Sequence, residues 1–167
     1  ARGGAVLAPG PHDLGIQYVD ARDLARLALD AGAAGRSGAV DTVSPRGGAT
    51  MGELLEACVD VTGSDAELVW VDPDFVTAQG IEPWGELPVW MPKDDVEMYA
   101  LHTSDVSRAL EWGLTIRPLH DTVADTWAWV QQVDSSGAVP EPRPGIGLDP
   151  GKEAAALAVW DAGQPRS

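Results

Sequence analysis

The chain has 167 residues and a formal net charge of −15, and its 11 basic residues are scattered among 26 acidic ones. Nucleic acids and anionic membranes are bound by clustered Lys and Arg, so this balance argues against both as partners. A hydrophobic content of 44% is typical of a globular protein, and the single cysteine excludes an internal disulfide. Because no signal peptide or membrane-spanning run is evident, we expect a cytoplasmic protein.

The first elements along the chain are expected to be strand, extended segment and helix. The run at 5–11 predicts a short strand that ends at its Pro and Gly residues, and 15–20 predicts a second extended piece. Asp20 is a typical N-cap for a helix at 21–31. Helix capping and the field at the helix start explain both Asp20 and Asp23 better than catalysis does.

Glycines at 32, 35 and 38 have the G-x-x-G-x-x-G spacing found in dinucleotide-binding turns. Such a turn must follow a strand and open a helix, so that helix N–H groups face the pyrophosphate. Here a predicted helix comes first and a predicted strand at 39–44 follows, so the nearer helix end carries the unfavourable end of the dipole. The segment therefore predicts a helix stop, with Gly32 as a left-handed C-cap, and no cofactor-binding residue.

The middle of the chain is expected to alternate between helix and strand. Thr50 and Glu53 form a capping box for a helix that should end at Gly63. The run at 67–71 predicts a strand, and the segment at 72–80 predicts a short helix that begins with Asp-Pro. The single cysteine, Cys58, falls on the apolar face of the first of these helices, which favours a small buried hydrophobic residue over a nucleophile.

Residues 81–101 are irregular and rich in Trp and Pro. Trp84 and Trp90 could wall or cover an apolar substrate pocket. The alternative is a loop that folds back onto the core and uses Trp for buried area. The histidines at 12, 102 and 120 follow no metal-binding spacing, so no metal site is predicted.

The C-terminal third predicts three helices. They are expected at 104–113, at 119–132, where the longest amphipathic pattern occurs, and at 148–162. The chain thus divides into a main part at 1–132, a Pro- and Gly-rich linker at 133–147 and a terminal helix. Two large apolar residues of that helix should dock it on the core, Leu157 and Trp160.

Three segments in this order resemble the C-terminal half of the NAD(P)-dependent epimerase/dehydratase family, the extended and atypical short-chain dehydrogenases/reductases. They are IQYVDARDLARLAL (16–29), GAVDTVSPRGGATMGELLEAC (38–58) and SDVSRALEWGLTIRPLHDTVADTWAWV (104–130). The resemblance covers roughly residues 5–131. The closing GLDPGKEAAALAVW is similar to the tail of bacterial members of the family.

The resemblance implies an α/β fold, mixed α+β in this piece: the C-terminal part of a Rossmann-like protein without its N-terminal βαβ nucleotide-binding half. The family's catalytic Tyr-x-x-x-Lys pair has no match, since Arg22 and Thr103 stand four residues after Tyr18 and Tyr99. The chain would then have no catalytic or cofactor-binding residue and would be inactive alone, with NAD or NADP bound by the missing half. Exposed strand edges, above all at 39–44, would pair with that half or with a second copy in a homo-dimer.

The same resemblance points to a small or sugar-like substrate. Gln17 and Tyr18 align with positions that border the substrate cleft, and Trp84 and Trp90 join them as candidate substrate-binding residues. Where members that bind nucleotide sugars place an Arg on the phosphates, this chain has Ile16, which disfavours a nucleotide sugar. The alternative function is a stand-alone, non-catalytic domain that binds a ligand or a partner.

Overall fold

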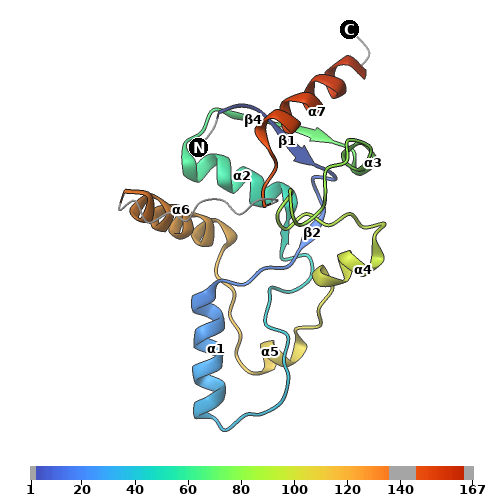
Figure 1. Cartoon of the computed structure of the whole chain (residues 1–167). Coiled ribbons are helices and arrows are strands. Elements are labelled where there is room, and N and C mark those ends of the chain that lie inside the picture. The colour runs from blue at the N-terminus through green and yellow to red at the C-terminus, as the bar shows by residue number, and fades with distance from the viewer. Residues whose placement is uncertain (1–2, 136–145, 164–167) are drawn as a thin grey trace.

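The computed structural model describes residues 3–135 and 146–163 and confirms a mixed α/β architecture (Figure 1). Short strands and helices alternate through the first half, and helices dominate the second. The elements in chain order are β1 (Gly4–Pro9), β2 (Gly15–Ile16), α1 (Ala21–Ala33), β3 (Ala49–Thr50), α2 (Met51–Thr62), β4 (Ala66–Val71), α3 (Pro73–Ala78), α4 (Val96–Tyr99), the 3-10 turn η1 (Ala100–His102), α5 (Ser107–Glu111), α6 (Leu119–Ser135) and α7 (Pro150–Gly163).

Two small sheets organise the described residues. β1 and β4 run parallel over six residue pairs, from Gly4 opposite Ala66 to Pro9 opposite Val71. β2 and β3 form a short antiparallel ladder. Helix α7 lies against β1, where the carboxylate of Glu153 accepts a hydrogen bond of 2.9 Å from the backbone N–H of Leu7. Helix α2 packs against α6 on another side of the molecule (Figure 1).

The main core lies between the parallel strands, α2, α3 and α7. Its largest fully buried side chains include Trp90, Leu14 and Ile16. Leu157 and Trp160 pack against this core, as predicted, and the Trp160 ring meets Phe75 edge-on. A second, smaller cluster joins α1 to α5 and the segment after it through Leu27, Val106, Ala109 and Leu114.

The predicted helix starts at Asp20 and Thr50 are confirmed. The Asp20 side chain accepts a hydrogen bond from the backbone N–H of Arg22. In the capping box, the N–H of Glu53 donates to Thr50 Oγ1 over 3.2 Å, and the N–H of Thr50 donates to the Glu53 carboxylate over 2.8 Å. Gly63 ends α2 in the left-handed conformation, with φ of 61°. These signals are local, so no tertiary partner is needed for them to act.

The prediction of a strand at 39–44 is wrong, and with it the exposed edge expected there. The segment is irregular and is held by scattered hydrogen bonds, such as that from the N–H of Ser44 to the carbonyl of Tyr18. A β-branched run forms a strand only where a neighbouring strand can pair with it. Here the strand pairing of this region is taken by β2 and β3.

Two helix ends also differ from prediction. Helix α1 continues through Gly32 to Ala33, and Gly35, with φ of 65°, takes the left-handed conformation predicted for Gly32. Helix α5 begins only at Ser107, where the Asp105 carboxylate accepts a hydrogen bond from the Ser107 N–H. Because a helix can continue through one glycine at a cost of about 1 kcal/mol, the first glycine of a run need not stop it.

The last two helices lie close to their predicted bounds, and α7 covers Pro150–Gly163 where 148–162 was predicted. Helix α6 continues to Ser135, so the first residues of the segment at 133–147 are helical, and 136–145 lie outside the described residues. Within the described ranges, no helix is both long and apolar enough to cross a membrane.

Candidate functional site

An apolar pocket of about 560 Å³ opens between α2, α6, the segment that follows β2, and the irregular stretch at 81–92, here called the Trp loop. Among the described residues that line it, none is Lys, Arg, Asp or Glu. Its volume is in the range of sites that hold one small organic molecule. The lining comes from Ile16, Gln17, Tyr18, Val19, Leu54, Cys58, Thr62, Trp84, Val89, His102, Leu119, Thr122, Val123, Thr126, Trp127 and Val130.

The structure brings three of the four candidate substrate residues to this pocket. Gln17, Tyr18 and Trp84 all line it, and Trp84 is 56% exposed at its mouth. Trp90 lies elsewhere: it is fully buried in the core, and its indole N–H donates to the carbonyl of Gly10 over 2.9 Å. The two alternatives for the Trp loop were a pocket wall and a segment folded back onto the core. Each holds for one residue, because Trp90 anchors the loop to the core and Trp84 lines the pocket.

The side-chain amide of Gln17 is held by the protein itself. Its Nε2 donates to the carbonyls of Ser44 and Ser104, over 2.8 and 3.2 Å, and its Oε1 accepts from the N–H of Ser104 over 2.7 Å. A buried amide with these partners joins three chain segments that are far apart in sequence. Gln17 therefore shapes the pocket wall.

His102 joins the same wall to the Trp loop. Its Nδ1 accepts a hydrogen bond from the backbone N–H of Gln17 over 3.0 Å, and its Nε2 donates to the carbonyl of Val89 over 2.8 Å. These two bonds require the proton on Nε2 and a lone pair on Nδ1. The imidazole is buried and both of its nitrogens are in use, so it is a brace and not a proton-transfer group.

The backbone is strained where the Trp loop meets the pocket. Trp84 and Val89 have φ of 61° and 70°, which is the left-handed region, and both line the pocket. For a β-branched residue such as Val89 this conformation is a clear outlier. Strain of this kind costs about 1–3 kcal/mol per residue and gathers at functional sites. The hydrogen bond from His102 to the Val89 carbonyl helps to hold this shape.

An ion network around two buried carboxylates, Asp20 and Asp23, joins the start of α1 to α6 and the residues before it. Asp23 accepts hydrogen bonds from the backbone N–H and the guanidinium of Arg117, the shortest of them 2.6 Å. Asp20 accepts from the Arg22 guanidinium over 2.7 Å and from the hydroxyl of Thr122, a pocket residue, over 3.0 Å. The capping role predicted for the two aspartates thus extends to positioning α6.

The same ion network shifts the pKa values of side chains near the pocket. Hydrogen bonds from Arg22 hold the pKa of Asp20 well below its usual range, and Arg117 lowers the pKa of Asp23 in the same way. Burial raises the pKa of the Tyr18 phenol, and the carboxylate of Asp23 adds to the shift. The phenol, which donates to the carbonyl of Arg117 over 3.0 Å, therefore stays protonated at neutral pH.

Most of the pocket lining was not predicted from the sequence, and Trp127 and Cys58 show why. Trp127 belongs to the apolar stripe of α6, which also holds Val123 and Val130 and reads in the sequence as a core-facing side; in the structure this stripe lines the pocket. Cys58 was expected to be buried in the core, but it is half-buried at the pocket wall. Burial raises the pKa of its thiol, so a thiolate nucleophile is not favoured there.

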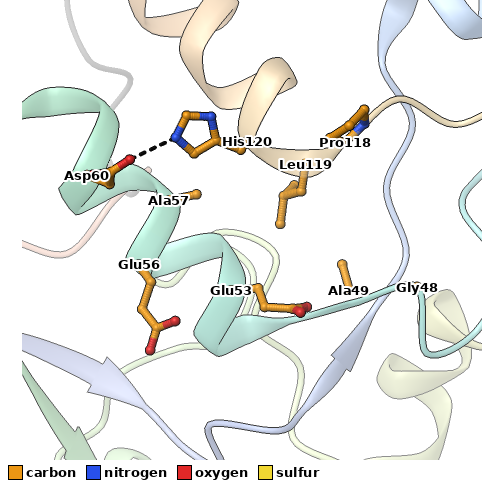
Figure 2. Close-up of a pocket in the computed structure, with 9 residues that line it drawn as sticks. All are labelled: Gly48, Ala49, Glu53, Glu56, Ala57, Asp60, Pro118, Leu119 and His120. Carbon is orange, nitrogen blue, oxygen red and sulfur yellow. Dashed lines mark hydrogen bonds and ion pairs between the residues drawn. The ribbon is translucent and has the colours of Figure 1, made fainter.

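A second hollow, of about 450 Å³, lies between α2 and the start of α6 (Figure 2). Its side chains include the carboxylates Glu53, Glu56 and Asp60. Each has a partner: Glu53 completes the capping box, Glu56 contacts His12 over 2.8 Å, and Asp60 contacts His120 over 2.8 Å. Because these carboxylates already pair within the protein, the apolar pocket is the better candidate site.

Among the described residues, no cluster of three His, Cys, Asp or Glu side chains could hold a metal ion. Comparisons of the chain with protein-family models, curated proteins and solved structures find no match. Function is therefore inferred from the pocket and from the segments that form it.

Proposed function

We propose that this chain is the substrate-binding part of an NAD(P)-dependent epimerase, dehydratase or reductase of the extended or atypical short-chain dehydrogenase type. The proposal is carried by one observation: the three segments that resemble this family meet at one pocket. The segment at 16–29 contributes Ile16, Gln17, Tyr18 and Val19, the segment at 38–58 contributes Leu54 and Cys58, and the segment at 104–130 contributes Leu119, Thr122, Val123, Thr126, Trp127 and Val130.

The glycine segment at 32–38 lacks the chain order of a dinucleotide-binding turn. It continues from the C-terminal end of α1 and leads into irregular chain, so it does not open a helix of its own. A pyrophosphate is bound by helix N-terminal N–H groups, which carry the positive end of the dipole. The NAD(P) site of the proposed enzyme would therefore lie in its nucleotide-binding half, outside this chain.

The pocket supports a role in binding without chemistry of its own. His102 uses both ring nitrogens on backbone partners, and Tyr18 donates its phenolic proton to a backbone carbonyl. General acid–base catalysis needs a side chain that can exchange a proton with the substrate. In the proposed enzyme the Tyr-x-x-x-Lys pair of the other half would supply it.

The parallel sheet supports the same proposal. Two parallel strands alone are rare, because parallel sheets are normally larger and are covered by helices on both faces. β1 and β4 make such a pair, and no further strand joins them within the described ranges. Strands of a nucleotide-binding half would extend this sheet.

Cofactor titration tests the proposal. We expect neither NADH nor NADPH to bind to this chain, as followed by nucleotide fluorescence, and micromolar binding would contradict the assignment of the cofactor site to another half.

The gene sequence upstream of the codon for Ala1 separates the enzyme from a stand-alone binding domain. The enzyme requires a strand followed by G-x-x-G-x-x-G and then a Tyr-x-x-x-Lys pair there, and an unrelated domain or a start codon in its place would refute it.

A further inference from the structure

We propose that the ligand of the apolar pocket is an uncharged, largely apolar molecule that carries a carbonyl or ether oxygen. This inference rests on the proposed function, because it names the substrate class of the same pocket. Beyond the proposed function, it excludes phosphorylated substrates as a class and names the side chains that select the ligand.

The pocket offers no positive charge to a phosphate. Its described lining contains no Lys or Arg, and the nearby guanidinium groups of Arg22 and Arg117 are paired with the carboxylates of Asp20 and Asp23. A diphosphate is held by charge-assisted hydrogen bonds and would lose its hydration in apolar surroundings without replacement. The net charge of −15 adds long-range repulsion. An uncharged ligand has none of these costs.

The hydroxyl groups around the pocket already donate to the protein. Tyr18 donates to the carbonyl of Arg117, Thr122 to the carboxylate of Asp20, and Thr126 to the carbonyl of Thr122. Thr62 likewise donates to the carbonyl of Cys58, and the amide of Gln17 is held as described above. Few donors are therefore left to bind the hydroxyl oxygens of a ligand such as a sugar.

Two indole N–H groups differ from the other polar groups of the lining. Within the part of the chain that the structure describes, neither Trp84 nor Trp127 donates a side-chain hydrogen bond, although both line the pocket. An indole N–H can only donate, so its partner must be an acceptor. The two rings belong to different elements, the Trp loop and α6. They select a ligand that combines a flat apolar body with an acceptor oxygen.

A neutral fluorophore with a carbonyl group tests this inference on the full 167-residue chain. We use 6-propionyl-2-(dimethylamino)naphthalene, whose emission shifts to the blue in apolar surroundings, and compare it with 6-propyl-2-(dimethylamino)naphthalene, in which a methylene group replaces the carbonyl. We expect the carbonyl probe to bind about five-fold more tightly, as one added hydrogen bond predicts. Apolar partition alone would favour the other probe. UDP-glucose, as a diphosphate competitor, should not displace either one.

Three variants assign the binding to the pocket. Val123→Arg places a charge in the lining, and Thr126→Trp fills the rim of the pocket at an exposed position of α6 without adding charge. Each should weaken binding of the carbonyl probe by about ten-fold or more. The control, Leu29→Arg, adds the same charge at an exposed site of α1 away from the lining and should leave binding unchanged. Circular dichroism verifies that each variant is folded.

The outcomes separate this inference from the proposed function. Displacement of the probe by UDP-glucose overturns the inference but leaves a substrate-binding chain. Equal or tighter binding of the probe without the carbonyl overturns the role of the indole groups. Binding that is insensitive to Thr126→Trp overturns the site, and failure of every probe to bind removes the pocket as support for the proposed function as well.

Discussion

Gln17 and His102 both border the pocket, yet their hydrogen bonds go to the protein. Gln17 holds Ser44 and Ser104 together, and His102 holds Gln17 to Val89. The resemblance pointed to Gln17 as a residue of the substrate cleft. His102 could not be found from the sequence, because a lone histidine carries no local signal and its partners come from distant segments. What such residues contribute becomes visible only once the chain is folded.

Replacing His102 by leucine tests its role as a brace. His102→Leu leaves the N–H of Gln17 and the carbonyl of Val89 without a partner in a buried place, so we expect the free energy of unfolding in urea to fall by about 2–4 kcal/mol. The control is His12→Leu, at an exposed histidine paired with Glu56, where a loss below about 1 kcal/mol is expected. Equal losses in the two variants would mean that His102 has no special structural role.

The buried carboxylate of Asp23 makes stability depend on acid. Its pKa is lowered in the folded chain, so the unfolded chain binds more protons as the pH falls through the usual carboxyl pKa of about 4. Its contribution is therefore complete above that pH and is lost as the pH falls through the lowered folded value. We expect Asp23→Asn to cost about 2 kcal/mol at pH 7 and to flatten the loss of stability between pH 5 and pH 3. Urea unfolding of both proteins across this range measures it, and parallel curves would refute it.

At the scale of elements, the sequence predicts correctly those helix ends that depend on neighbouring residues alone. The capping box at Thr50, the N-cap at Asp20 and the left-handed Gly63 depend on a few neighbouring residues, and all three are confirmed. The strand predicted at 39–44 failed because a strand needs a partner that its own residues do not specify. The end of α1 differs from prediction because a helix can continue through one glycine, so Gly32 does not stop it.

The capping box of α2 supports one wall of the pocket, and its loss can be measured. We expect Thr50→Ala to lower the free energy of unfolding by about 1 kcal/mol, because the N–H of Glu53 loses its acceptor. Thr77→Ala is the control, at an exposed position within α3, where the change should stay within about 0.5 kcal/mol. If thermal or urea unfolding gives the same value for both variants, the capping bond contributes nothing.

On the scale of the whole molecule, the pocket lies where elements from distant parts of the chain meet. The segments at 16–29, 38–58 and 104–130 could be identified from the sequence by their resemblance to the epimerase/dehydratase family. That they meet at one pocket could not be predicted, because their arrangement depends on side-chain pairs such as Arg117 with Asp23.

The free edge of a sheet was predicted at 39–44, but that segment is not a strand. α7 lies against β1, and β4 has no second strand partner within the described ranges. Association into a homo-dimer was expected through the edge at 39–44, and β4 is the edge that we now propose in its place. Sedimentation that shows only monomer would contradict this association.

In the proposed complex, a neutral ligand contacts both Trp84 and Trp127. A two-dimensional ¹H–¹⁵N spectrum resolves the indole N–H signals of the seven tryptophans. On titration with 6-propionyl-2-(dimethylamino)naphthalene, we predict that the signals of Trp84 and Trp127 move and that the signal of Trp90, buried and bonded to Gly10, stays in place. Movement of the Trp90 signal, or of the exposed Trp129 signal, without movement of Trp84 and Trp127 would contradict the account.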